Sequence, residues 1–479
     1  MTLINKLKSL LGITPVSVGE LNRRATYAGR QLPRWGKAPS PPADMVITPE
    51  YKRIISLIQA GTPIVFVSGN AGTGKTTLIH YIRDSYGKNV VVLAPTGVAA
   101  INAGGATIHS FFHFPPRIIT KDDITHLADR RLYTKLDLII VDEVSMVRAD
   151  LIDAMDMFLR TNGRDGDSPF GGVQIVFIGD LFQLPPVLGQ EEESALLARQ
   201  YKSPFFFSAR SLQGCEMVPI ELTKVFRQQN EQFIEMLNHI RVAENVKTFV
   251  TQINEACWHK DSNTDSTLTL TCTNAAADEI NLSKLRMLPG DSVTFIGETS
   301  GKFAAEGIRL PSPCNLCLKP GAQVMFTKND SERRWVNGTV GRVVGIKSGF
   351  IQVELLTDHS GTVYDVQRVT WETFKYEYDE KEDIIRPRIT GYYIQFPLML
   401  AWAVTIHKGQ GKTLENVRID LGRGAFASGQ VYVALSRCRS LHDISLARPI
   451  NFNEVKCDER IKRFYLALAE LQRDNEYEE

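Results

Sequence analysis

The sequence lacks a long apolar segment, and this absence excludes a membrane-spanning helix. The longest apolar run, at 392–404, is interrupted by Gln395 and Pro397 and is too short to cross a bilayer. The N-terminal stretch has lysines among its apolar residues, so it is not a secretory signal. We therefore expect a soluble intracellular protein without a membrane partner, in the cytoplasm or nucleoid of a bacterial or phage-like source.

The sequence also lacks a strong net charge and a metal-binding cysteine pattern. A net charge of +1 neither indicates nor excludes nucleic-acid binding, because a narrow basic groove can coexist with an acidic surface on the opposite side of the protein. The seven cysteines are scattered and odd in number, as is typical of reduced thiols. Cys314 and Cys317 form a lone CxxC, which we interpret as structural. His109 and His113 lack the Glu of a zinc-protease helix, so no metal role is predicted.

No repeat of fixed period is apparent, and 479 residues allow two to four domains. Residues 1–45 carry seven Lys or Arg against two Asp or Glu and end in a Pro-rich stretch. We interpret them as a basic leader that could form a short helix at 3–12 and could touch nucleic acid. From 46 to 215, β-branched strands alternate with helices, which predicts a doubly wound parallel sheet. Its strands are expected at 64–69, 90–96, 136–144 and 173–180.

A second α/β unit is expected over 216–340 and 391–465. Its strands are predicted at 267–272, 321–327 and 417–422. Over 341–390 the pattern changes to short alternating strands, which predicts a small antiparallel β-barrel inserted into this unit. Residues 466–479 are expected to form an acidic tail. The fold class is therefore α/β, with two parallel-sheet units and an inserted barrel.

The most specific motif is GNAGTGKT at 69–76, which fits G-x-x-x-x-G-K-[ST]. A buried strand precedes it and a helical segment follows it. Such a loop at a helix N-terminus binds phosphate through free N–H groups and the helix dipole. Lys75 is expected to reach the β- and γ-phosphates, and the Thr76 hydroxyl to hold Mg²⁺. The motif predicts binding of a nucleoside triphosphate.

An acidic pair ends the apolar strand in LIIVDEVSM. Two buried carboxylates are costly without a cation, which favours a functional role. Asp142 is expected to bind Mg²⁺, and Glu143 to take a proton from the attacking water.

Three further side chains are candidates for the hydrolytic step. Gln183, in GDLFQLPPV, could bond the γ-phosphate and the attacking water; an ordinary loop glutamine is the alternative. Arg227 and Arg437 lie in the second unit and could supply positive charge beyond the γ-phosphate, although surface ion pairs are the alternative. If they reach across, both units share one nucleotide and hydrolysis opens and closes their cleft, as in a motor.

Other phosphate-loop classes fit less well. The N-K-x-D guanine motif of GTPases is missing. The segment ASGQ at 427–430 faintly resembles a transporter ATPase signature, but it lies far beyond the acidic strand rather than just before it. Neither class is predicted.

Seven ordered stretches resemble the motifs of superfamily 1 helicases: APTGVAA (94–100), TIHSFF (107–112), VDEVSM, PFGGVQIVFIGDLFQLPPV (169–187), LTKVFRQ, TIHKGQGKTLE (405–415) and YVALSR. The fourth stretch and VMFTKND…WVNGTVG (324–341) resemble the Pif family in particular. The resemblance covers about residues 46–450.

This resemblance implies two RecA-like domains, a short wedge element near 97–107 and an inserted barrel. It also implies ATP- and Mg²⁺-dependent translocation 5′→3′ on single-stranded DNA, with unwinding at single-strand/duplex junctions, forks or G-quadruplexes. We expect a monomeric or weakly self-associating enzyme.

The resemblance also assigns site residues. The expected nucleotide contacts are Gly69, Ala71, Gly72, Thr73, Gly74, Lys75, Thr76, Thr77, Asp142 and Gly411. The expected DNA contacts are Thr96, His109, Ser110, Phe111, Thr405, His407 and Lys408. For the polar residues among them a helix-capping role is the alternative. Phe111, Phe112 and Phe182 are candidates for stacking on bases, with core packing as the alternative.

One position departs from the family pattern. The family usually places a Gln that reads adenine upstream of the phosphate loop, and Tyr51 stands at that position here. Tyrosine could stack on the base but cannot reproduce the paired bonds of an amide. Selectivity for adenine therefore stays open.

Two alternatives to a DNA helicase also stay open. The motor could act on RNA, or translocate on double-stranded DNA without unwinding it. Alternatively, the chain could be a nucleotide-switched DNA-binding module in which hydrolysis only times release.

Overall fold

The computed structural model describes residues 45–86, 89–188, 191–228, 230–258, 266–304, 310–356 and 361–476. The expectations for the leader, including its helix at 3–12, lie outside these residues. Among the described helices, none combines the length and the apolar character needed to cross a membrane.

The first lobe is built on a six-stranded parallel sheet of order β3-β2-β4-β5-β1-β6. Its strands are β1 (Ile64–Gly69), β2 (Val90–Ala94), β3 (Ala106–Thr107), β4 (Leu138–Val141), β5 (Gln174–Gly179) and β6 (Met217–Leu222). Every residue of β1, β2, β4 and β5 is buried, which explains why these four read as continuous apolar runs. The structure confirms all four as strands. The edge strands β3 and β6 were not predicted.

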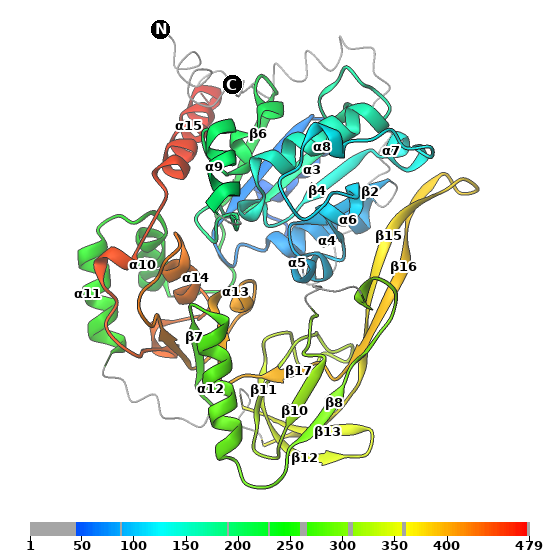
Figure 1. Cartoon of the computed structure of the whole chain (residues 1–479). Helices are drawn as coiled ribbons and strands as arrows, with labels where there is room; N and C mark the ends of the chain where they lie inside the picture. Colours follow the sequence, from blue (N-terminus) through cyan, green and yellow to red (C-terminus); the bar gives the residue numbers. More distant parts are fainter. Residues whose placement is uncertain are drawn as a thin grey trace.

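Helices cover both faces of this sheet (Figure 1). They are α3 (Pro49–Gln59), α4 (Lys75–Tyr86), α5 (Gly97–Ala103), α6 (Ile108–Phe112), α7 (Arg131–Lys135), α8 (Ala149–Asn162) and α9 (Glu191–Gln200). Residues 97–107 form α5 and the edge strand β3, which pairs with β2. The wedge role of this segment stays a prediction.

The second lobe contains a four-stranded parallel sheet of order β18-β7-β19-β20. Its strands are β7 (Leu268–Thr271), β18 (Ala403–Thr405), β19 (Val417–Asp420) and β20 (Ile444–Leu446). The surrounding helices are α10 (Glu231–Val242), α11 (Val246–Cys257), α12 (Asn274–Met287), α13 (Ile406–Gly409) and α14 (Gln430–Leu435). The strands predicted at 267–272 and 417–422 are therefore confirmed as members of a second parallel sheet.

The inserted β-structure is larger than the predicted segment 341–390. A five-stranded antiparallel sheet has the order β14-β13-β12-β11-β17. Its strands are β11 (Gln323–Phe326), β12 (Val340–Lys347), β13 (Phe350–Leu355), β14 (Val363–Gln367) and β17 (Leu398–Leu400). The pair β8 (Val293–Ile296) and β10 (Asn315–Leu318) shares its apolar core. The assignment of 321–327 to the second parallel sheet is thus wrong, because that strand pairs with β12 and β17.

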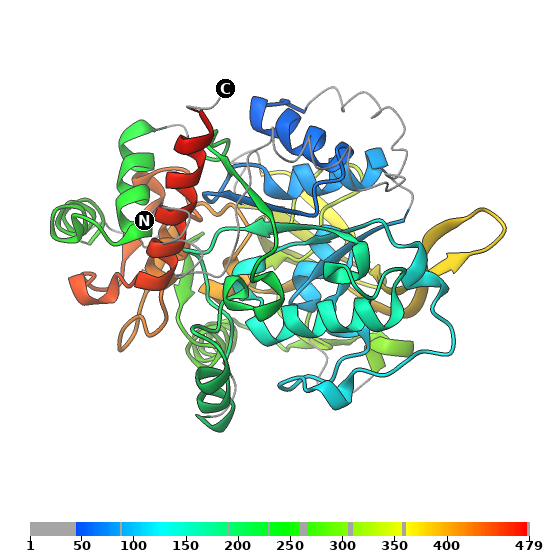
Figure 2. The same cartoon turned by 90° about the horizontal axis from the view of Figure 1, so that it is seen from above.

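A long hairpin connects the insert to the first lobe. It consists of β15 (Val369–Asp379) and β16 (Ile384–Gln395) and runs along the first lobe as far as α7 (Figures 1 and 2). Lys135 forms an ion pair with Asp383 at 2.7 Å, and the Ile385 N–H donates to Asn89 Oδ1 at 3.1 Å. Tyr376 is buried in the first-lobe core. The hairpin therefore docks through both apolar and polar contacts.

The last helix, α15 (Glu459–Glu476), returns to the first lobe. Phe464 stacks on Phe207 with ring centroids 4.3 Å apart, and it also contacts Phe66 of β1. Full burial of such a ring contributes about 1.5–3 kcal/mol. The predicted division into a second-lobe segment ending at 465 and an acidic tail is wrong here, because one helix spans this boundary and packs on the first lobe.

Candidate nucleotide and nucleic-acid site

The phosphate loop connects β1 to α4, as the motif predicts. Gly72 and Gly74 have φ values of 87° and 82°, which favour glycine. A Cβ atom on Gly74 would lie 2.5 Å from Tyr51 Oη, and one on Gly72 would lie 2.6 Å from Arg227 Cβ. Lys75 Nζ donates to the Gly69 and Asn70 carbonyls at 2.8 and 2.9 Å. The backbone conformation and the contacts with Tyr51 and Arg227 therefore require glycine at positions 72 and 74 of this loop, which leads into the N-terminus of α4.

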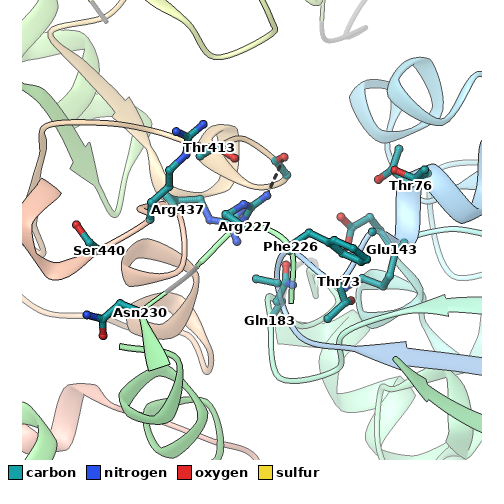
Figure 3. A pocket seen from close by; sticks show the side chains of 17 residues that line it. Thr73, Thr76, Glu143, Gln183, Phe226, Arg227, Asn230, Thr413, Arg437 and Ser440 are labelled. Atoms are coloured by element: carbon teal, nitrogen blue, oxygen red, sulfur yellow. Dashed lines mark hydrogen bonds between the residues drawn. The ribbon is translucent and has the colours of Figure 1, made fainter. Parts of the chain in front are cut away.

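A cavity of about 750 Å³ lies against this loop, and both lobes line it (Figure 3). The first lobe contributes Ala71, Gly72, Thr73, Gly74, Lys75, Thr76, Thr77, Glu143 and Gln183, and the part of the chain after β6 contributes Phe226, Arg227, Asn230, Gly411, Thr413, Arg437, Arg439 and Ser440. The five predicted catalytic residues thus face one space. Asp142, Gly69 and the predicted DNA contacts are outside this lining.

The acidic pair follows β4 directly. Glu143 adopts a left-handed backbone conformation (φ 48°), and its N–H donates to Asp142 Oδ1 at 2.8 Å. Burial raises the pKa of Asp142 to about 7, and the charge of Glu143 adds to this shift. Burial also raises the pKa of Glu143, while Lys75 and Arg437 oppose that shift. The role of Asp142 and of the Thr76 hydroxyl as magnesium ligands stays a prediction.

A glutamine of the second lobe contacts both first-lobe catalytic candidates. Gln410 Nε2 donates to Glu143 Oε2 at 3.1 Å and to Gln183 Oε1 at 3.3 Å. Gln183 Nε2 donates in turn to Asp180 Oδ2 at 3.2 Å. Sequence reasoning missed Gln410, although it lies within the segment TIHKGQGKTLE. Its position just after α13 links that segment to the hydrolytic centre.

The two arginines approach the cavity from the second lobe. Arg437 is 1% exposed, and its Nε donates to the Val433 carbonyl at 2.8 Å. Arg227 donates to the Ser436 and Gly411 carbonyls at 3.1 and 3.3 Å. Burial lowers the pKa of Arg437 to about 9, and Arg227 adds to this shift by repulsion. Within the described residues neither guanidinium forms an ion pair with a carboxylate, so both are free to neutralise an anion in the cavity.

A buried aspartate joins the phosphate loop to the second lobe. Asp180 is fully buried and forms an ion pair with Arg241 of α10 at 3.1 Å. Tyr432 of α14 donates to Asp180 Oδ2 at 3.0 Å, and its oxygen accepts from the Ala71 N–H at 3.1 Å. The sequence analysis did not single out these groups, because a Tyr or Arg inside a helix carries no signal of its partner. The backbone of the phosphate loop thus contacts the second lobe through the hydrogen bond from Ala71 to Tyr432.

Two of the three predicted DNA-contacting hydroxyls serve as helix caps. Thr96 accepts from the Ala99 N–H at the start of α5, and Thr405 accepts from the Lys408 N–H at the start of α13. Ser110 Oγ accepts from Lys302 Nζ at 2.7 Å. His109 and His407 are half-buried and Lys408 is exposed. The capping alternative holds for the two threonines, and the DNA role of all these residues stays a prediction.

The predicted stacking role of three phenylalanines is contradicted by their burial. Phe111, Phe112 and Phe182 are only 5%, 1% and 4% exposed. Phe111 and Phe112 belong to an aromatic cluster with Tyr133, and Phe182 stacks on Tyr465 of α15 at 4.8 Å. These rings are core residues: Phe111 and Phe112 pack α6 against Tyr133 of α7, and Phe182 packs against α15.

Tyr51 also differs from the expectation that it could stack on the base. It is 2% exposed, and its hydroxyl donates to the Gly74 carbonyl at 2.9 Å. Burial raises its pKa to about 12. Tyr51 therefore supports the phosphate loop through its hydrogen bond to Gly74 and does not line the cavity.

A glycine-rich loop at a helix N-terminus, in a cavity lined by two α/β lobes, indicates a nucleotide-binding protein of the phosphate-loop class. A model of the PIF1-like helicase family matches residues 47–257. Mouse ATP-dependent DNA helicase PIF1 is 32% identical over 498 residues, covering 97% of this chain and 72% of the relative. A crystal structure of Bacteroides Pif1 with ADP-AlF4 is 36% identical with a TM-score of 0.80, covering 89% of this chain and 98% of the other. A Bacteroides Pif1 complex with ADP-AlF3 and single-stranded DNA has the same identity and coverage but a TM-score of 0.64.

The chain belongs to the PIF1-like helicase family.

Proposed function

We propose that this chain hydrolyses ATP with Mg²⁺ to move 5′→3′ along single-stranded DNA and to unwind duplex DNA ahead of it. The observation that carries the proposal is the shared cavity. Lys75 and Glu143 enter it from the first lobe, and Arg227 and Arg437 from the second. Because the charged groups come from both lobes, hydrolysis changes the attraction that holds the lobes together.

Each of these side chains has a role in phosphoryl transfer. Lys75 and the two arginines balance the charge that develops on the γ-phosphoryl group. Thr76 and Asp142 would hold Mg²⁺, which would supply positive charge to offset that of the phosphates. Glu143 accepts a proton from the attacking water, and Gln183 orients that water.

The DNA track is supported by the position of two threonines and by the relatives. Thr96 and Thr405 each stand between a parallel strand and the helix that follows it, one in each lobe, at the strand ends where ligands bind α/β sheets. A relative binds single-stranded DNA together with a nucleotide analogue. The lower TM-score to that complex, at equal identity, supports a change of conformation when DNA binds.

An unwinding assay tests this function. Duplexes with a 5′ tail, a 3′ tail or an RNA tail are incubated with ATP and Mg²⁺, and strand separation and ATP hydrolysis are measured. We expect separation of the 5′-tailed DNA and strong stimulation of hydrolysis by single-stranded DNA. Stimulation by RNA alone would contradict the DNA track, and binding without turnover would indicate a nucleotide-switched module. Forked and G-quadruplex substrates in the same assay rank the preferred structures.

A further inference from the structure

The two oxygens of the buried Asp180 side chain have different partners. Oδ1 accepts from Nε and Nη2 of Arg241 at 3.2 and 3.1 Å, and from the Phe182 N–H at 3.2 Å. Oδ2 accepts from Gln183 Nε2 at 3.2 Å and from the Tyr432 hydroxyl at 3.0 Å. Arg241 is the cation in this set of partners, so it balances the charge that Asp180 brings into the core.

Arg241 is held in place by packing as well as by charge. It lies near the end of α10 in the second lobe and is only 8% exposed. Its guanidinium carbon lies 4.4 Å from the centroid of the Phe182 ring and 5.5 Å from that of Tyr465 in α15. Arg241 does not line the nucleotide cavity, so we expect its influence on the reaction to pass through Asp180.

Asp180 determines which end of the Gln183 amide faces the cavity. A carboxylate accepts hydrogen bonds and an amide NH₂ group donates them, so Gln183 Nε2 is turned towards Asp180. The carbonyl oxygen Oε1 is left on the cavity side, where Gln410 Nε2 lies 3.3 Å away (Figure 3). An amide oxygen has two lone pairs, so Oε1 can also accept a hydrogen bond from the attacking water. A reversed amide would donate to that water instead and would occupy the lone pair that must attack phosphorus.

We propose that Arg241 is a positioning residue for ATP hydrolysis: by balancing the charge of Asp180, it keeps the carbonyl oxygen of Gln183 turned towards the attacking water. The inference rests on the proposed function and deepens it. Arg241 belongs to α10 of the second lobe, whereas Asp180 and Gln183 follow β5 of the first. The orientation of this glutamine is therefore set by a contact between the lobes.

A double-mutant cycle tests this inference. We measure kcat and KM for ATP hydrolysis, with and without single-stranded DNA, in the native chain, Arg241→Met, Gln183→Ala and the double variant. Each single variant should lose about tenfold to 100-fold in kcat, because small misplacements of a reacting group cost this much, while KM stays within about threefold. The double variant should lose no more than Gln183→Ala alone, because Arg241 acts through Gln183. Losses that multiply, or native kcat in either single variant, would overturn the proposal.

A second set of variants separates positioning from loss of fold. Arg241→Met leaves Asp180 as an unpaired buried charge, which destabilises the fold. Combining it with Asp180→Asn removes both charges, and the Asn amide both donates and accepts, so it no longer fixes the direction of Gln183. This combination should unfold in urea like the native chain yet show the same loss of kcat as Arg241→Met. Native kcat in it would contradict the assignment.

Arg241→Lys tests the role of the charge. It retains a cation that can donate to Asp180 Oδ1, and it should recover most of the kcat that Arg241→Met loses; a Lys variant as slow as Arg241→Met would contradict the proposal. Because the cycle is measured from hydrolysis with and without DNA, it is separable from the proposed function. Hydrolysis that single-stranded DNA does not stimulate would contradict the DNA track and would leave the cycle readable in the absence of DNA.

Discussion

Replacing Gln410 with alanine should make ATP hydrolysis more sensitive to acid. The Gln410 amide donates to the Glu143 carboxylate at 3.1 Å, and this bond lowers the pKa of Glu143 against the raising effect of burial. Without it the pKa of Glu143 rises further. Since a general base acts in its deprotonated form, the acidic limb of the pH profile should move to higher pH.

The size of the effect follows from the bond. A hydrogen bond to a charged group contributes about 1.5–3 kcal/mol. This energy corresponds to a loss of about tenfold or more in kcat on the acidic limb, with little loss where Glu143 is fully ionised. The assay is kcat for single-stranded-DNA-stimulated hydrolysis between pH 5.5 and 9. Gln410→Glu places a second carboxylate near Glu143 and should move the limb further in the same direction. Identical pH profiles for Gln410→Ala and the native chain would refute the effect of this bond on the pKa of Glu143.

Other variants test the remaining roles. Lys75→Ala should abolish turnover and weaken binding of labelled ADP; native turnover would exclude its phosphate contact. Glu143→Gln should bind ATP but hydrolyse it poorly in single-turnover measurements, and near-native rates would exclude it as the base. Arg437→Ala should reduce kcat by about 10³-fold or more with little change in DNA affinity, because it supplies charge at the transition state; equal losses in both would point to misfolding. Tyr432→Phe removes the bond to Asp180 and should lower the free energy of unfolding in urea by about 1–3 kcal/mol, whereas unchanged unfolding would show that the bond contributes nothing.

The buried parallel strands could be predicted because their environment is uniform. A strand covered on both faces is apolar along its whole length, and β1, β2, β4 and β5 show this pattern. The same reasoning failed at β11, which is equally apolar but pairs with antiparallel neighbours. The apolar composition of a strand predicts that it is buried, but it does not predict whether the neighbouring strands run parallel or antiparallel to it.

The site could be predicted where a motif lies on one loop, and not where partners come from distant segments. The phosphate loop and the acidic pair carry their chemistry in contiguous residues. Gln410 and Tyr432 acquire their roles only because the second lobe closes on Glu143 and Asp180. Phe111 shows the opposite failure, since a loop aromatic looks the same in sequence whether it faces solvent or the core.

The return of α15 to the first lobe has a mechanical consequence. The chain leaves the first lobe between β6 and α10 and re-enters it just before Glu459, so two covalent crossings join the lobes. One crossing starts at the end of β6 and the other ends at the aromatic cluster of Phe464 and Phe207. Any change in the angle between the lobes must therefore be accommodated by the backbone of these two segments.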